Sequence, residues 1–320
     1  MLSLAYLARR LFAAAVTILV AVSLNFVLFR VLPGNAVTHI ARIPNASVEM
    51  RRALEAKFGL DKPIWEQFLI YLREMAHGNL GISYANRQPV LDNLLEAFSN
   101  TIPMVATGVV LALGLGLVVG TIAASRRNGP ADHLLTGSAV LAYAFPTQFL
   151  GLMMVILFSG LLPAAGMADP FLISDSWWEV AQDRILHMIL PVTTLVLTLY
   201  AENALITRSS MLETLGEDYI LTARAKGVPR RRIILRHALR NALLPIVTMS
   251  ALSLGSIVSG AILVEVIFSW PGIGRTLYEA VLNRDYPMLQ GGFLAITVVV
   301  TMLNLTADLL HFVLDPRVRA

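Results

Sequence analysis

The chain has 320 residues, of which 56% are hydrophobic and only 14% are charged, and its formal net charge is +4. Soluble domains carry about a quarter charged residues, so this composition excludes an ordinary soluble protein and indicates a polytopic membrane protein. Cysteine is absent, which excludes disulfides, thiolate metal sites and cysteine nucleophiles. The small net charge gives no indication of a nucleic-acid surface, and we expect no nucleic-acid partner.

The first uncharged segment, residues 11–29, follows Arg9 and Arg10 and is long enough to span a bilayer. It lacks the short apolar core and cleavage site of a signal peptide, so it predicts a transmembrane helix with its amino terminus inside. Residues 37–100 form the only long polar region, with helical periodicity over 47–58 and 65–77. We expect these residues to form a long extracytoplasmic segment. An amphipathic cap that lies on the outer leaflet would be enough to explain this segment.

Five more apolar segments predict five more spans, over residues 101–125, 134–162, 185–206, 243–266 and 286–307. Pro146 removes a backbone donor within the third of them and predicts a kink that leaves the Ala142 carbonyl without its usual partner. Six spans place both termini in the cytosol. The arginine distribution agrees, because the two short outer loops carry only Arg184, Arg275 and Arg284.

The segment 207–242 separates the fourth and fifth spans and is dense in cations, namely Arg208, Arg224, Lys226, Arg230, Arg231, Arg232, Arg236 and Arg240. Lysine and arginine resist translocation, so we expect it in the cytosol. Residues 219–226 predict a short helix that Gly227 ends with a positive φ. Pro229 then starts a second helix over 230–243. This is a docking element, or a topology signal that contacts anionic membrane lipids, and both can hold.

The spacing of this loop also carries a family resemblance. Thr222 and Ala223, three further residues, Gly227, and then Leu244 and Pro245 resemble the EAA loop of ABC importer permeases. The versions ARAKG and RHALRNALLP are similar to those of permeases for dipeptides, oligopeptides and nickel. The order of motifs elsewhere agrees, from LARRL and LPGN through FGLDKPIWEQFLIYL and GNLGISY to QPVLDNLLEAFSNT. The chain departs from the family at Leu221, where the family often has Glu, Gln or Arg. Asn35 and Asn79 stand where the family often has Asp.

The resemblance implies a type I ABC importer permease architecture, with residues 1–320 as a single transmembrane permease domain. It implies a second homologous permease in a heterodimer, two cytoplasmic ATPase subunits and an extracytoplasmic substrate-binding protein, in a bacterial or archaeal cytoplasmic membrane. Residues 37–100 would then form part of the seat for the binding protein. The segment 207–242 would be the coupling loop, with its ATPase contacts at Tyr219, Thr222, Ala223, Arg224, Ala225, Lys226 and Gly227.

No enzyme activity is expected of this chain. It has no GxxxxGK[ST] phosphate loop, so ATP and Mg are expected on the ATPase subunits and no cofactor or metal on this chain. Asp308 and His311 lie one helical turn apart, which fits a proton or metal relay, or more simply an anchor at the end of the helix. An intramembrane hydrolase is disfavoured because no nucleophile and base occur at a recognisable spacing.

Two groups of polar residues are candidates for the wall of a translocation path. Ser250, Ser253 and Ser256 recur every three residues along one helix face, a pattern that small-residue helix packing also explains. The other group flanks Pro146 and consists of Tyr143, Thr147 and Gln148, which helix–helix hydrogen bonding would equally explain. Tyr143 and Thr147 share a face if the kink is mild.

A stand-alone channel or secondary transporter for a small polar solute is the main alternative function. The centres of the predicted spans carry no charge, whereas a proton-coupled carrier needs a titrating group inside the membrane. The expected substrate of an importer is a peptide. The sequence leaves open dipeptides, oligopeptides, nickel, glutathione and small glycans, because the binding protein makes the selection in such systems.

Overall fold

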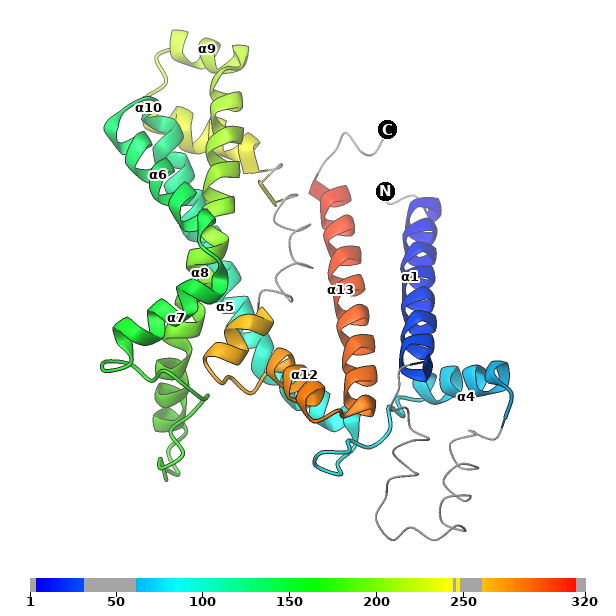
Figure 1. Cartoon of the computed structure of the whole chain (residues 1–320). Coiled ribbons are helices and arrows are strands. Elements are labelled where there is room, and N and C mark those ends of the chain that lie inside the picture. Colours follow the sequence, from blue (N-terminus) through cyan, green and yellow to red (C-terminus); the bar gives the residue numbers. More distant parts are fainter. Residues whose placement is uncertain (1–3, 32–61, 244–245, 248–260, 315–320) are drawn as a thin grey trace. The chain divides into compact units, whose positions relative to one another are not determined.

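The computed structural model describes residues 4–31, 62–243, 246–247 and 261–314, and these ranges are helical apart from turns and loops (Figure 1). One isolated β-bridge, between Ile82 and Pro89, is described. Four helices are long and apolar enough to cross a membrane, and a bent helix pair brings the number to as many as five. The predicted all-helical class is therefore confirmed over these residues. The predicted helix 47–58 and most of the predicted span 243–266 lie outside them.

The chain divides into two compact units, which are described separately. The main unit contains residues 99–275 with 1–2 and 303–320, and the second unit contains residues 3–98 and 276–302. Helices α5 (Val90–Ser125), α12 (Ile273–Leu282) and α13 (Tyr286–Leu314) pass from one unit to the other.

Two long helices, α5 and α8 (Trp177–Leu215), run through the main unit. With 36 and 39 residues, they are about 54 and 58 Å long at 1.5 Å per residue. The predicted spans 101–125 and 185–206 correspond to their apolar parts. Both helices are longer than the predicted spans. The adjoining polar residues 90–100 and 207–215 contain good helix formers and continue the same backbone hydrogen-bonding pattern.

Small residues let α5 and α8 approach closely. A Cβ added to Gly116 would lie 2.5 Å from Cβ of Asn203, and one added to Gly120 would lie 2.5 Å from Cβ of Thr207. Glycines four residues apart share a helix face, and small-xxx-small pairs of this kind are typical of helix contacts inside membranes. The contact fixes the end of α8 beside the end of α5.

The predicted third span is broken into two helices, α6 (Pro130–Ala144) and α7 (Thr147–Phe158), which meet at 101°. Pro146 has no N–H, and the Ala142 carbonyl instead accepts from the Phe145 amide at 3.3 Å. Phe145 and Phe149 then stack with their ring centroids 5.2 Å apart. The predicted kink at Pro146 is confirmed, and at 101° it is too sharp for Tyr143 and Thr147 to share the face of one continuous helix.

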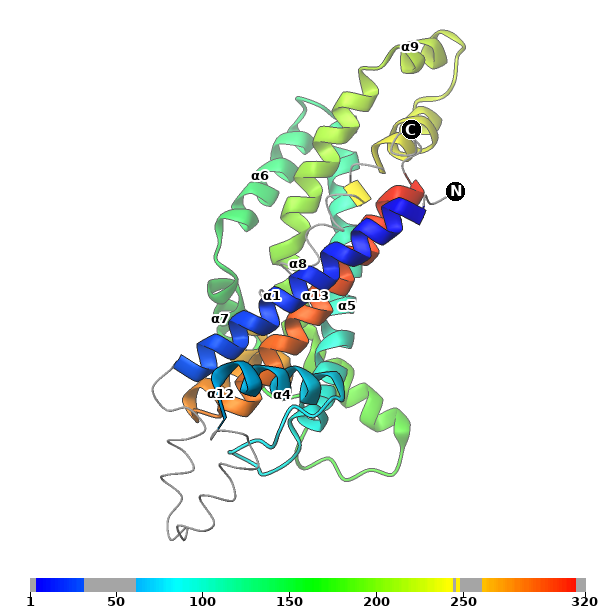
Figure 2. The same cartoon turned by 90° about the vertical axis from the view of Figure 1, so that its right-hand side faces the viewer.

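In the second unit, α1 (Leu4–Val31) runs antiparallel to the first part of α13, and α4 (Ile64–Ala76) crosses the end of α1 (Figures 1 and 2). Phe26 of α1 contacts Phe68 with a centroid distance of 5.2 Å, and Phe29 contacts Tyr286 at 6.3 Å. Asn25 Nδ2 donates to the Gln290 carbonyl at 2.8 Å. Helix α4 confirms the predicted helix over 65–77.

The loop between α4 and α5 is held by a buried carboxylate in the same unit. Asp285 is 1% exposed, and its Oδ2 accepts from Ser83 Oγ at 2.5 Å and from the Ala85 amide at 3.2 Å. Its Oδ1 accepts from the Met288 amide at 3.2 Å in the first turn of α13. The GNLGISY motif is therefore tied to the start of the last helix.

Candidate functional site

The predicted coupling loop is described from residue 207 to residue 243, beginning with the end of α8. It contains the short helix α9 (Asp218–Ala225), then α10 (Arg230–Arg232) and the π-helical turn η1 (Ile233–Ala238), after which helix continues to residue 243. Both predicted helices are therefore confirmed. The second is not uniform, because it contains a π-turn of the kind that recurs at functional sites.

Helix α9 ends in a Schellman motif. The Val228 amide donates to the Ala223 carbonyl at 3.1 Å, and the Gly227 amide donates to the Arg224 carbonyl at 2.9 Å. Gly227 has the predicted positive φ of 73°, which glycine adopts without a Cβ penalty. Pro229 lies at the N-cap, and the second helix begins at Arg230, as predicted.

One edge of α9 is buried and the rest is exposed. Ile220 is 0% exposed and Ala223 is 9% exposed, and both pack with Met211 of α8, Ala124 of α5 and Ile233 of η1. Burying an isoleucine side chain contributes about 1.5–3 kcal/mol, so α9 is fixed to the ends of two long helices. The exposed predicted contacts are Tyr219, Thr222, Arg224, Ala225, Lys226 and Gly227.

A hydrogen bond joins the two parts of the loop. Asn241 Nδ2 donates to Tyr219 Oη at 2.7 Å, across 22 residues of sequence. Thr222 Oγ1 donates to the Asp218 carbonyl one turn earlier at 3.1 Å, and Thr222 is exposed. The structure therefore brings the predicted coupling residues together on one short, anchored helix and the turn that follows it, with Ala223 as the member that packs into the hydrophobic cluster.

Asp132 and Arg208 form an ion pair near the carboxyl end of α8, which the sequence analysis did not predict. Arg208 Nε and Nη2 donate to the two oxygens of Asp132 at 2.7 and 2.8 Å, and Thr136 Oγ1 and the Asn128 amide also donate to this carboxylate. Asp132 is 2% exposed. The bidentate pair fixes the start of α6 against α8. Its members are 76 residues apart, so no local pattern identifies it.

Glu265 organises the turn over residues 268–274, which leads into α12. The carboxylate is 0% exposed and accepts from Thr101 Oγ1 at 2.6 Å, from the Gly274 amide at 2.6 Å and from the Arg275 amide at 3.2 Å. It therefore caps the first turn of α12, a helix that the sequence analysis missed. The amphipathic sequence IGRTLYEAVL was the available signal.

The structure describes three of the six residues that were predicted to line a translocation path. Tyr143 and Gln148 are exposed and Thr147 is partly exposed, on either side of the break at Pro146. No side-chain hydrogen bond of these three residues is found in the described part of the chain. Ser250, Ser253 and Ser256 lie outside the described residues. Over the same ranges, no group of three or more histidine and acidic residues could hold a metal ion.

These features define a membrane-embedded helical permease with an anchored helical loop. Residues 116–320 match the family described as "Binding-protein-dependent transport system inner membrane component", and residues 3–105 match its N-terminal companion. The chain belongs to this family, the permease subunits of ABC importers, and ATP hydrolysis in these transporters resides on a separate chain. The alternative of a stand-alone channel is thereby set aside.

Relatives and one solved structure agree with this assignment. The chain is 40% identical to the dipeptide transport system permease protein DppB of Escherichia coli K12, over 99% of each chain. It is 36% identical to the di/tripeptide permease DppB of Pseudomonas aeruginosa, again over 99% of each, and 36% identical to the glutathione permease GsiC of E. coli, over 98% of each. The inward-facing MetNI methionine ABC transporter shares the fold, with a TM-score of 0.55, 16% identity and coverage of 69% of this chain and 96% of that chain.

Proposed function

We propose that the segment 207–242 is the cytoplasmic coupling loop of this importer subunit and that α9 is the part that contacts an ATPase. This proposal rests on the division of α9 into a buried edge, Ile220 and Ala223, and an exposed surface, which bears Tyr219 and Thr222 and continues to Lys226 in the turn that follows. A partner that displaces the exposed surface also displaces the buried edge. Because that edge packs against α5, α8 and η1, the displacement reaches the transmembrane helices and biases one of two access states.

A charge reversal tests this role. Lys226→Glu changes the exposed surface next to Gly227 without touching the hydrophobic cluster, and Arg231→Glu makes the same charge change on α10. We expect Lys226→Glu to lose the co-purifying ATPase and substrate uptake, and Arg231→Glu to retain both. Equal retention of the ATPase by the two variants would refute the docking surface. Membrane insertion of both variants is checked by protease protection.

We further propose six spans, with both termini and the coupling loop in the cytosol. Support comes from the described crossing helices, the helix over 261–267 at the end of the predicted fifth span, and the concentration of arginine in the predicted inner segments. The absence of cysteine makes single-cysteine labelling direct. Arg231→Cys should react with an impermeant maleimide only in inverted vesicles, and Phe171→Cys, in an exposed loop, only in intact cells. The opposite pattern would reverse the topology.

The proposed assembly is a heterodimer of this chain with a second homologous permease, together with two ATPases that bind ATP and Mg and an extracytoplasmic binding protein. The proposed location is a bacterial or archaeal cytoplasmic membrane. Short peptides are the proposed substrates, because the relatives are named for dipeptides, di/tripeptides and glutathione. Uptake of a labelled dipeptide that depends on this chain would support that substrate class, and uptake of nickel alone would contradict it.

We propose that the translocation path passes the break between α6 and α7 at Pro146. Tyr143, Thr147 and Gln148 offer an amide and hydroxyls there, and the three serines outside the described residues are proposed to face the same path. Gln148→Ala should lower peptide uptake while leaving assembly unchanged. Unchanged uptake in the Tyr143, Thr147 and Gln148 alanine variants would exclude this wall of the path.

A further inference from the structure

A cavity lies beside α9 in the main unit. It has a volume of about 840 Å³ and is bounded by the end of α5, the end of α8, the turn after α9, and the start of the α10–η1 helix. Its apolar wall consists of Leu212, Leu215, Val228, Ile233 and Ile234. Pockets of about 300–1,000 Å³ are the size that holds small organic ligands, so the space exceeds what a bare inorganic ion fills.

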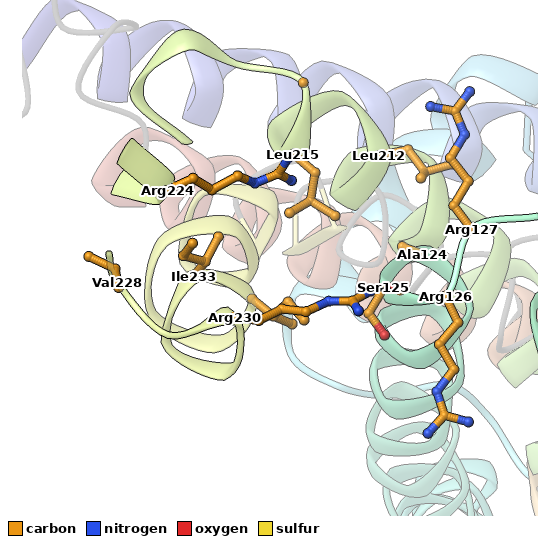
Figure 3. Close-up of a pocket in the computed structure, with 12 residues that line it drawn as sticks. Ala124, Ser125, Arg126, Arg127, Leu212, Leu215, Arg224, Val228, Arg230 and Ile233 are labelled. Carbon is orange, nitrogen blue, oxygen red and sulfur yellow. Dashed lines mark hydrogen bonds between the residues drawn. The ribbon is translucent and has the colours of Figure 1, made fainter. Parts of the chain in front are cut away.

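The polar part of this cavity is strongly cationic. Arg126, Arg127, Arg224 and Arg230 line it, and none of the aspartates and glutamates that the structure describes does. Figure 3 shows Arg224 and Arg230 extending from the loop towards the ends of α8 and α5, while Arg126 and Arg127 leave the end of α5 in opposite directions. All four residues are exposed. No salt bridge of these four arginines occurs within the described ranges, whereas Arg208 nearby is paired with Asp132.

One arginine is already oriented by the protein. Arg230 Nη2 donates to the Ser125 carbonyl at the end of α5, so part of its guanidinium is held in place while other N–H groups stay available. A guanidinium offers five donors in a planar fork that matches phosphate geometry. Four arginines beside an apolar wall favour a ligand that combines a phosphate group with an apolar or neutral part.

We propose that this cavity binds a phosphate-bearing ligand, either the headgroup of an anionic phospholipid or a soluble organic phosphate. The ligand's phosphate contacts Arg224 on α9, Arg230 on α10 and Arg126, which directly follows α5, and thereby holds α9 against the ends of the long helices. The binding is a property of this chain alone. It goes beyond the proposed docking of an ATPase, and its test does not depend on that docking.

The test uses the full chain without ATPases, because ATPases bind phosphates themselves. The chain is reconstituted in nanodiscs of phosphatidylcholine, with or without phosphatidylglycerol. Native mass spectrometry of the released chain counts retained phosphatidylglycerol. Calorimetric titration with glycerol 3-phosphate, in the phosphatidylcholine nanodiscs, measures the binding of a soluble organic phosphate. Retention in the first arm identifies a lipid headgroup, and binding in the second identifies a soluble phosphate; either result supports the site.

Matched variants separate the cavity from general surface charge. Arg224→Gln with Arg230→Gln removes two lining cations, and Arg231→Gln with Arg232→Gln removes two adjacent cations that do not line the cavity. A hydrogen bond to a charged group contributes about 1.5–3 kcal/mol, so the first variant should bind about tenfold more weakly or worse, and the second within about twofold of wild type.

Arg230→Gln also removes the hydrogen bond to the Ser125 carbonyl and so alters the loop itself. A third variant separates this effect from the loss of ligand binding. Arg126→Gln lies outside the loop, directly after α5, and should weaken binding by about tenfold on its own. Equal loss in the pocket and control double variants would overturn the proposal. So would the absence of binding in both arms for the wild-type chain, which would leave the cavity to an acidic segment of a partner protein.

Discussion

Two glycine-containing turns in the main unit are built in opposite ways. At Gly227 the φ angle is +73°, and an added Cβ would meet no atom within 4 Å. At Gly274 no left-handed backbone is involved, but an added Cβ would lie 2.8 Å from Cβ of Ile262 and closer still to its Cα. The first turn requires glycine for its backbone conformation, and the second requires glycine for its packing.

The surroundings of the two turns differ in the same way. The turn before α12 is held by Glu265, whose carboxylate is 0% exposed and joins Thr101 to the start of α12. The turn after α9 is flanked by the exposed residues Arg224 and Lys226, and only Ile220 and Ala223 of α9 are buried. A turn whose glycine is closely packed suits a fixed corner. A turn that is open around its glycine suits a surface that another protein contacts.

The largest effect is expected at the packed turn. Gly274→Ala places a methyl group against the Ile262 backbone, which cannot move without shifting its helix. Overpacking of this kind costs about 3 kcal/mol of unfolding free energy, measured by denaturant unfolding of the chain in detergent. The control is Gly137→Ala on α6, where an added Cβ meets nothing within 4 Å. A stable Gly274→Ala variant would contradict the packing difference between the two turns.

A second large effect is expected at the carboxylate that holds the same turn. Glu265→Ala leaves the Thr101 hydroxyl and the Gly274 amide without their acceptor in a buried site, at a cost of about 2–3 kcal/mol. Glu265→Gln keeps one carbonyl oxygen and should cost less than the alanine variant. Unfolding midpoints measured side by side give the order. If the alanine and glutamine variants match wild type, Glu265 does not hold the turn.

The sequence predicted the local parts of both regions and missed the long-range parts. Hydrophobic length located the cores of α1, α5, α8 and α13, and the positive φ of Gly227 followed from its place after a short helix. The pairs Glu265–Thr101 and Asp132–Arg208 are 164 and 76 residues apart. Periodicity reports only which residues share a face of one helix, so it carries no information about such pairs.

The break at Pro146 is an intermediate case. Its position follows from the missing N–H of proline, a local property. Its size, 101°, follows from packing, because Leu150 and Gly151 of α7 are buried while α6 and α7 each pack on α8. The sequence could therefore place the break but could not state that the two halves separate into different helices.

A smaller effect on stability, with a larger one on transport, is expected at the open turn. Gly227→Ala forces a Cβ into the left-handed region, at about 1–2 kcal/mol, and tilts the exposed residues at the end of α9. Gly227→Asn should cost less, because asparagine tolerates this conformation. We expect normal insertion of both variants, with peptide uptake reduced more in the alanine variant. Wild-type uptake in a folded Gly227→Ala variant would remove the turn from coupling.

The smallest effect is expected at the hydrogen bond that joins the two parts of the loop. Tyr219→Phe removes the acceptor of Asn241 Nδ2 but keeps the ring, and because Asn241 is exposed its amide can turn to water. The cost is therefore about 0.5–1 kcal/mol, at the low end for a hydrogen bond. Hydrogen exchange should quicken at α9 amides and stay unchanged at the Glu265 turn. Quickened exchange at both turns would mean that they unfold together, and the contrast between an open and a fixed turn would fail.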